Sequence, residues 1–573
     1  MISIFQTLRK QAQNKSKNIV LLFFTIRHLA GRQIVYRVYY ALRKVLPFSR
    51  TNVSRVRKRN SQFILSPSIQ RNWECSSNEF SFLGKTLSFD DVTTIEWYPV
   101  STSKLWQYHF HSFDYLLSKV FLTDEEAAKQ LILSWVMTHK KKTSGAIGWA
   151  PYPLSLRIVS WVKWMQSVHC YDSVIIDSLS SQYNLLLQNI EYHVLGNHLL
   201  KNIKALLYSA AFFSGEEEVL DKVIQLLGEE IDEQILKDGG HFELSPMYHA
   251  AVLEDLLDVY NLVVNNPSVF EQYHGLLPKV QTTIALMLEW LEDMSFGNTL
   301  SYFNDVSQNE APTLLELRAY AAALHIPFHS HVPKLLKVKK DSGYSIISLQ
   351  SIRLIVDHGK MGPAYLPAHA HCDLFSFELA INEHRIICNS GTDDYGNLST
   401  RQLLRSTQAH NTATVDGQEQ AEMWGAFRVA RRPKNIVFHV DERADCIYFE
   451  GKYDGYKHQK AFMEDYTRNI IVNKQSEQIT VEDIYRGEGF HTIHSYLHFH
   501  PRIDIKPQEN GYSFSNSTDG INGYVEFNKN SHVEAVRRPF FEEFGCMQQH
   551  YCLIISQSAF SPNTVSYTLS IGR

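Results

Sequence analysis

LKVKKDSGYSIISL, residues 336–349, is the stretch across which the sequence changes its pattern. Before it, from about 90 to 335, apolar residues recur at helical spacing, as in Val252, Leu253, Leu256, Leu257, Tyr260 and Val263. After it come short alternating or β-branched runs such as IRLIVDH (352–358) and FSFELAI (375–381). We predict a multidomain chain, α then β: an arm with lead-in helices at 1–89, helices at 90–338 and antiparallel sheet at 339–573. Charges and a turn in LKVKKDS (336–342) separate the two halves.

Length and composition describe a folded protein of more than one domain. At 573 residues the chain exceeds what one hydrophobic core usually supports, and 44% hydrophobic with 20% charged residues is ordinary. The seven cysteines contain no CxxC pair, which disfavours a disulfide framework and favours a reducing compartment. No window reaches the roughly 18 apolar residues of a membrane span. We expect no transmembrane span and a cytoplasmic location, with a periplasmic or secreted one as the alternative.

The N-terminal arm is strongly basic, because residues 1–60 contain many Lys and Arg but no Asp or Glu. Within it, IVLLFFTI (19–26) resembles a short signal-peptide core, but Arg27 follows directly and no A-x-A cleavage site is evident. We expect residues 19–45 to form an amphipathic helix that packs on the next domain. The alternative is peripheral contact with anionic lipid or polysaccharide.

Asn197 and His198 stand where a helix begins, since leucines and isoleucines follow them at helical spacing. On one interpretation Asn197 is only the helix N-cap and His198 occupies the first turn. On the other, an amide and an imidazole at a helix N-terminus bind a substrate carboxylate, which the positive end of the helix dipole also favours.

GGHFELSPMYH (239–249) combines a glycine turn with a helix start: Ser245 is a plausible N-cap, and Pro246 fits the first helical position. Tyr248 then lies in the first turn. A lone tyrosine here is more often a core residue, but the helix dipole and neighbouring cations are expected to stabilise its phenolate and favour proton transfer. His241 and Glu243 are candidate substrate-binding residues.

PAHAHCD (367–373) leads into a strand-like run. If it is extended, alternation places His369, His371 and Asp373 on one face. His-x-His is a common metal-ligand spacing but also fits a hydrogen-bonded pair.

Arg401 and Arg405 are four residues apart and share a face if they are helical. Such a guanidinium pair suits carboxylate or sulfate groups of a substrate, although a solvated basic face is the plainer interpretation. His410 is a candidate second imidazole beside His371.

Taken in order, NH (197–198), GGHFELSPMYH (239–249), HAHCDLFSFEL (369–379), GTDDYG (391–396) and RSTQAHNT (405–412) resemble the heparinase II/III family of polysaccharide lyases, which are heparinase- or alginate-lyase-like enzymes. The resemblance implies an incomplete (α/α) toroid followed by an antiparallel β-sandwich. It also implies β-elimination at a uronic acid of an acidic polysaccharide such as a glycosaminoglycan. Catalysis would then involve Asn197 or His198 on the carboxylate, Tyr248 as acid and also base, and His369 in proton abstraction.

The resemblance also implies a structural zinc ion in the sheet domain, at positions corresponding to His371, Asn389 and His410. Because Asn389 replaces an aspartate, either Asp373 substitutes for it or the metal is absent. A second departure is Lys201, one helical turn beyond His198, where some relatives place an acid.

Two alternatives stay open. In a glycoside hydrolase, Glu243 and Asp373 would form the general acid and base pair. A non-catalytic polysaccharide-binding protein of a surface-polysaccharide assembly system would suit the basic arm. No cofactor other than the zinc ion and no nucleic-acid partner is expected, and the sequence gives no oligomeric state.

Overall fold

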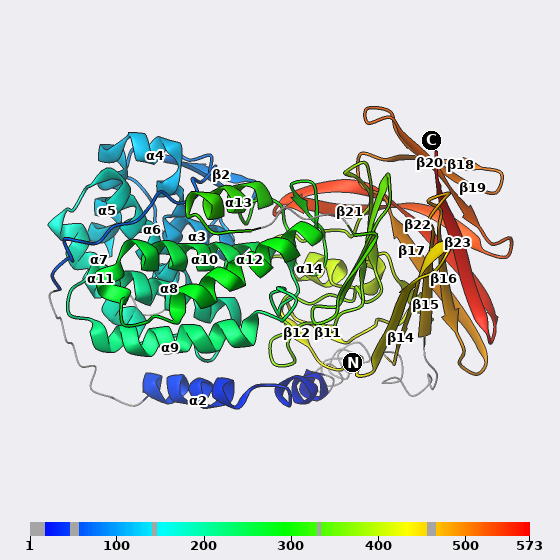
Figure 1. The fold of residues 1–573 in the computed structure, drawn as a ribbon, viewed down its shortest axis with the longest axis horizontal. Helices are drawn as coiled ribbons and strands as arrows, with labels where there is room; N and C mark the ends of the chain where they lie inside the picture. The colour runs from blue at the N-terminus through cyan, green and yellow to red at the C-terminus, as the bar shows by residue number, and fades with distance from the viewer. Residues whose placement is uncertain (1–17, 46–56, 140–145, 329–333, 455–465, 573) are drawn as a thin grey trace, which may run out of the picture.

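The computed structural model describes residues 18–45, 57–139, 146–328, 334–454 and 466–572. Helices fill one side of the molecule and sheets the other (Figure 1). The helices of the first half are α3 (Lys104–Ser112), α4 (Lys119–Thr123), α5 (Glu125–Thr138), α6 (Pro151–Val168), α7 (Ser173–Leu187), α8 (Gly196–Phe212), α9 (Glu217–Gln234), α10 (Pro246–Asn265), α11 (Pro267–Phe270), α12 (Leu276–Asp293) and α13 (Leu314–Ala323). The predicted order, helices and then antiparallel sheets, is confirmed.

The helices pack around one apolar core. α6 packs against α8, α8 against α9, and α10 against α12. Large buried rings, including those of Trp106, Trp161 and Tyr208, fill the space between them. Burial of these rings stabilises the helical domain far more than helix propensity does. Ring closure into an incomplete toroid stays a prediction.

Three antiparallel sheets make up most of the second half. The first contains β5 (Leu336–Lys339), β6 (Tyr344–Ser348), β7 (Ile352–Asp357), β8 (Phe377–Ile381) and β9 (His384–Ile387) in that order. The second has the order β10 (Ala413–Val415), β17 (Phe490–His498), β22 (Cys546–Phe560), β21 (His532–Glu543). The third has the order β13 (Ile436–Glu442), β14 (Cys446–Tyr453), β15 (Tyr466–Asn473), β16 (Ile479–Tyr485), β23 (Asn563–Ile571), β20 (Ile521–Phe527), β19 (Gly511–Asn516), β18 (Asp504–Gln508). Leu379, Ile470 and Leu553, one from each sheet, share a core, as in a sandwich.

The sequence boundary at 336–342 needs correction. Leu336–Lys339 is not a separator but strand β5, paired antiparallel with β6 from Leu336↔Ile347 to Lys339↔Tyr344. The alternation of Leu and Val with Lys, which we assigned to the charges and turn that separate the two halves, is the period-two pattern of a half-buried strand. Only the residues after Lys339 form the turn.

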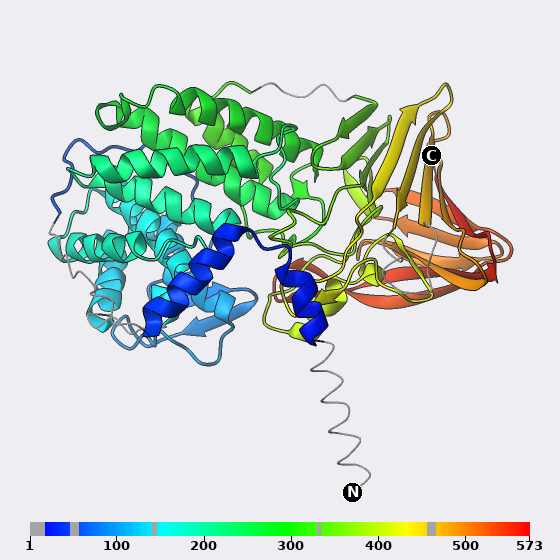
Figure 2. The ribbon, with the colours of Figure 1, turned by 90° about the horizontal axis from the view of Figure 1, so that it is seen from below.

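The N-terminal arm forms two helices, α1 (Asn18–Ile26) and α2 (Gly31–Val45). The chain bends by 116° between them. Residues 1–17 and 46–56 of the predicted basic arm lie outside the described residues. In Figure 2, α2 runs beside the helical half and α1 beside the sheet half. No single helix of the described residues is long and apolar enough to cross a membrane, although α1 and α2 pass that test together as a bent pair.

Candidate active site

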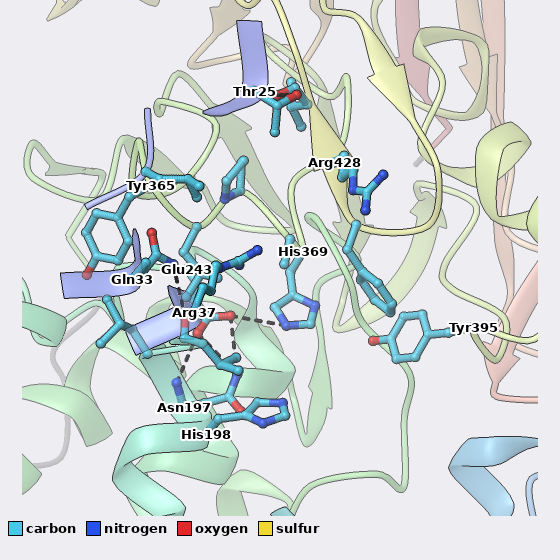
Figure 3. Close-up of a pocket in the computed structure, with 18 of the residues that line it drawn as sticks. Thr25, Gln33, Arg37, Asn197, His198, Glu243, Tyr365, His369, Tyr395 and Arg428 are labelled. Carbon is cyan, nitrogen blue, oxygen red and sulfur yellow. Dashed lines mark hydrogen bonds and ion pairs between the residues drawn. The ribbon is translucent and has the colours of Figure 1, made fainter. Parts of the chain in front are cut away.

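A cavity of about 810 Å³ lies where the arm, the helical domain and the sheet domain meet. Its walls include the side chains of Asn197 and Tyr248 from the helical half and of His369 from the sheet half. Figure 3 shows His369 and Asn197 on either side of Glu243. Residues more than 100 positions apart in the chain therefore face one space.

Asn197 enters the cavity from the start of α8. The N-cap of this helix is Leu195, so the interpretation of Asn197 as an N-cap is wrong. The Asn197 Nδ2 atom instead donates to Glu243 Oε1 at 3.1 Å and Oε2 at 3.4 Å, and its backbone N–H donates to Oε1 at 3.3 Å. The amide thus already binds a carboxylate, which is the chemistry needed for a uronate group.

Tyr248 lies in the first turn of α10, as predicted: Ser245 is the N-cap and accepts a hydrogen bond from the Tyr248 N–H at 3.2 Å, and Pro246 is the first helical residue. The Tyr248 hydroxyl is 3.0 Å from the Tyr395 hydroxyl. The ring centroids of Tyr248 and His369 are 3.8 Å apart. A phenol and an imidazole from different domains are therefore in contact.

The expected stabilisation of the Tyr248 phenolate is wrong for the unliganded site. Burial, followed by Tyr395 and Asp305, raises the pKa of the phenol well above its usual value. The helix dipole falls off within the first turn and is outweighed by the removal of the phenol from water. Tyr248 is consequently a protonated group, able to donate, at any physiological pH.

His369 lies in a loop and not in an extended strand, so the expected face of His369, His371 and Asp373 does not form. The carboxylate that both imidazoles bind is Asp305: His369 Nδ1 lies 2.8 Å from Oδ2, and His371 Nε2 lies 2.7 Å from Oδ1. Asp373 instead accepts a hydrogen bond from the Asn304 N–H at 2.9 Å.

Asp305 is a buried anion that orients His369. Burial would raise the pKa of its carboxyl, but Arg401 and the hydrogen bonds from His369 and His371 hold the pKa well below the usual range. Arg401 donates to both carboxylate oxygens. With Nδ1 of His369 facing this carboxylate, Nε2 is directed toward Glu243 Oε2 at 3.2 Å.

Arg401 and Arg405 do share one face of a helix, α14 (Leu398–Leu404), with Arg405 at its C-cap, but the face is buried. Arg401 pairs with Asp305, and Arg405 donates to the carbonyl oxygens of Ala370 and Ala426. Burial and the neighbouring Arg401 lower the pKa of Arg405 to about 9. Their assignment to substrate binding needs correction, because both guanidiniums support the His369 loop instead.

His241 is also misassigned as a substrate-binding residue. It is fully buried, its Nε2 lies 3.1 Å from Gln234 Oε1, and it does not line the cavity. Glu243, two residues further on, does line the cavity and connects Asn197 with His369.

His198 lines the cavity with a third of its side chain exposed. Its ring lies 4.3 Å from that of Tyr152, and its Nδ1 is 3.2 Å from Glu191 Oε1. Burial would raise the pKa of Glu191, but His198 and Asn202 hold it below its usual value. Glu191 therefore supplies the acid that Lys201 does not, while Lys201 binds Asp255 at 2.7 Å.

A second cavity of about 620 Å³ continues beyond Tyr248. Tyr108, Tyr152, Tyr248 and Tyr395 line both spaces. The two cavities thus form a path on either side of the phenol, which suits a chain of sugars stacking on aromatic rings.

The predicted zinc ligands do not present a complete donor set. The His371 and His410 ring centroids are 5.1 Å apart. Within the described part of the chain, His371 Nδ1 and both His410 nitrogens are buried without a hydrogen-bond partner. The Asn389 Oδ1 atom accepts a hydrogen bond from Ser376 Oγ at 2.7 Å. The other polar atom of this side chain, Nδ2, carries N–H donors and cannot bind a metal ion. Among the residues with described placement, no three His, Cys, Asp or Glu side chains could hold a metal ion. Two imidazoles fall short of the four ligands of a structural zinc site, and no catalytic step is derived through one.

Sequence comparison finds two family models along the chain. The model of the heparinase II/III N-terminus matches residues 36–326, and that of the heparinase II/III-like C-terminal region matches residues 331–567. The heparin-sulfate lyase of Bacteroides stercoris is 23% identical over 458 residues, which cover 69% of this chain and 66% of that protein. The heparin-sulfate lyase of Pedobacter heparinus is 24% identical over 411 residues, covering 65% and 61%. The chain thus aligns with slightly less than two thirds of the length of these relatives.

Structure comparison finds the same fold in solved structures. A crystal structure of heparinase III matches with a TM-score of 0.67 and 18% identity, covering 83% of this chain and 79% of that one. A mutant of the heparan sulfate lyase HepC from Pedobacter heparinus matches with a TM-score of 0.59 and 15% identity, covering 90% and 86%. Both matches span the helical and the sheet domain.

Proposed function

We propose that this chain, which belongs to the heparinase II/III family, is a polysaccharide lyase that cleaves a uronic-acid-containing polysaccharide by β-elimination. The observation that carries the proposal is the contact between the phenol of Tyr248 and the imidazole of His369, in one cavity with the Asn197 amide. Elimination needs a base at C5, an acid at O4 and a neutralising group at the carboxylate, all around one sugar.

Asn197 is the proposed carboxylate ligand, with His198 beside it. Its amide donates to Glu243, so an entering uronate replaces one carboxylate by another. The amide and the helix N-terminus then stabilise the charge that develops on the carboxylate when the C5 proton leaves.

His369 is the proposed base. Asp305 fixes the ring through Nδ1 and leaves Nε2 as the atom that accepts the C5 proton. The 3.2 Å contact of Nε2 with Glu243 needs one proton between them, so the basic form requires that proton to reside on Glu243 or Glu243 to turn away.

Tyr248 is the proposed acid. Its raised pKa keeps the phenol protonated, and it donates that proton to the departing O4 oxygen. This assignment narrows the expectation drawn from the family resemblance, in which the same tyrosine also acts as base. Release of the C5 proton from His369 Nε2 to the medium and reprotonation of Tyr248 from the medium complete the cycle.

A glycosaminoglycan is the proposed substrate class, because the curated relatives are heparin-sulfate lyases. The hydrolase alternative loses support since Asp373 lines neither cavity and so does not face Glu243 across a substrate.

Mass spectrometry of the products tests the proposal. Purified protein is incubated with heparan sulfate, chondroitin sulfate, hyaluronan and alginate. β-Elimination yields fragments lighter by one water than the hydrolysis products, with a double bond in the terminal uronate. Fragments carrying the added water would identify a hydrolase, and no fragments with any of the four polymers would contradict the lyase proposal.

A further inference from the structure

The arm helices expose an unusual number of large apolar side chains. Those with more than a third of their surface exposed are Ile19, Val20, Leu22, Phe23, Ile26, Ile34, Val35, Val38, Tyr39, Leu42 and Val45. In α2, positions 34, 35, 38, 42 and 45 follow helical spacing and form one aliphatic stripe. A surface helix ordinarily buries such a stripe against the core, and this one does not.

The face of α2 that does contact the body is polar and aromatic. Gln33 Nε2 donates to the Val194 carbonyl at 3.3 Å, and the Tyr40 hydroxyl donates to the Ile190 carbonyl at 2.5 Å. Arg32 pairs with Glu230 at 3.3 Å. The helix is therefore held by polar contacts, while Val35, Leu42 and Val45 of its aliphatic stripe are exposed away from the cavity.

Positive charge is concentrated in the arm, which also carries the aliphatic stripe. Residues 1–60 contain 14 Lys and Arg and no Asp or Glu, so with a total of −4 the remaining 513 residues carry −18. At the arm, Arg27 and Arg37 are exposed, and Arg428 of the sheet domain lies on the rim of the same cavity. Burial, and after it the nearby Arg27, lowers the pKa of Arg432 to about 10.

The arm connects the two domains across the cavity. In α1, Thr25 Oγ1 accepts from Trp424 Nε1 at 3.0 Å, and Phe24 lies under Arg431 at 4.1 Å, so this helix rests on the sheet domain. Leu22, Ile26, Ile34 and Val38 line the cavity from the arm side. These four residues are also exposed, so the apolar surface of the arm reaches the cavity.

We propose that the arm, residues 18–45, docks the protein on the surface of an anionic lipid bilayer. Val35, Leu42 and Val45 of α2 and Phe23 of α1 enter the headgroup region, and Arg27 and Arg37 contact lipid phosphates. Basic residues beside outward aliphatic residues are the chemistry of an interfacial helix. An anionic polysaccharide would bind the arginines but would not bury the aliphatic side chains. A lipid bilayer does both, and we therefore favour lipid as the partner.

Sedimentation of the full chain with vesicles tests the docking. We expect binding to vesicles of phosphatidylcholine with phosphatidylglycerol, weak binding to phosphatidylcholine alone, and a decrease with salt. The variant Phe23→Ser/Val35→Ser/Leu42→Ser removes apolar side chains that do not line the cavity, and we expect at least about tenfold weaker binding. Circular dichroism and thermal melting check that it is folded.

The matched control is Val437→Ser/Phe490→Ser/Phe560→Ser, which removes equally exposed apolar side chains from the sheet domain. Its vesicle binding should equal that of the wild type. Equal loss in both triple variants, or wild-type binding independent of anionic lipid, would overturn the proposal. Failure of the wild type to sediment, with retention on a heparin column that both variants keep, would identify the arm's cations as a polysaccharide surface instead.

Discussion

At the scale of single residues, Tyr395 contributes to the raised pKa of Tyr248. After burial, it is the largest contributor to the raised pKa of Tyr248, and the two hydroxyls are 3.0 Å apart. Tyr395→Phe should therefore lower the pKa of Tyr248. If Tyr248 acts as the acid, its protonated form is lost at lower pH, and the alkaline limb of kcat/KM moves toward lower pH.

The pH–rate profiles of the wild type and Tyr395→Phe measure this shift. Tyr273→Phe is the matched control, because it removes another tyrosine hydroxyl, bonded to Asp221 on the surface of the helical domain. An alkaline limb that stays in place or moves toward higher pH in Tyr395→Phe would show that Tyr248 is not the acid.

Local signals in the sequence predicted where α10 begins and where Tyr248 lies in it. Ser245 and Pro246 fixed the start of α10, and the position of Tyr248 followed from them. The sequence did not indicate the high pKa of Tyr248, because burial of its phenol depends on the tertiary fold. Asp305 was missed altogether, since it lies in a loop without a motif and reaches His369 only through the tertiary fold.

At the scale of elements, Asn389 follows the end of β9, and its replacement by aspartate tests its role in the predicted zinc site. Asn389→Asp would restore, as a buried carboxylate, the acid that the family resemblance implies together with His371 and His410. Without metal this unpaired charge should destabilise the protein, and with zinc it should add a third ligand to the two imidazoles. We expect a lower Tm than wild type in chelator and a rise on adding zinc.

Melting curves with chelator and with zinc, together with metal analysis after dialysis, measure this effect. Asn469→Asp, a buried amide in β15 of the third sheet, is the control and should show no zinc-dependent rise. A wild type that retains one zinc ion per chain would contradict the view that its donor set is incomplete.

The pattern of whole elements was predictable, whereas their edges were not. Helical and strand periodicities separated the two halves, because each reflects which face is buried. Strand β5 was assigned to the charges and turn between the two halves, because its two lysines resemble a charged turn and its alternation of apolar and charged residues is only four residues long. The segment 367–373 alternates like a strand but forms a loop, held by Asp305, Arg401 and Arg405, whose contacts no local pattern contains.

At the scale of the whole molecule, the proposed chemistry depends on the helical and sheet domains closing on one cavity, with the arm across both (Figure 1). Neither domain alone contains both the phenol and the imidazole. Separating the domains should therefore abolish turnover, and it would also expose the apolar cluster that Trp290 and Phe303 form with Ile346 across the boundary.

Turnover of Tyr248→Phe tests the central claim most directly. Wild type and variant are mixed with a uronate polysaccharide, the ultraviolet absorbance of unsaturated ends is followed, and substrate binding is measured separately. We predict a steady rise for the wild type and a rate about 10²–10⁴-fold lower for Tyr248→Phe, with substrate affinity little changed. A variant that produces unsaturated ends at the wild-type rate would contradict the account.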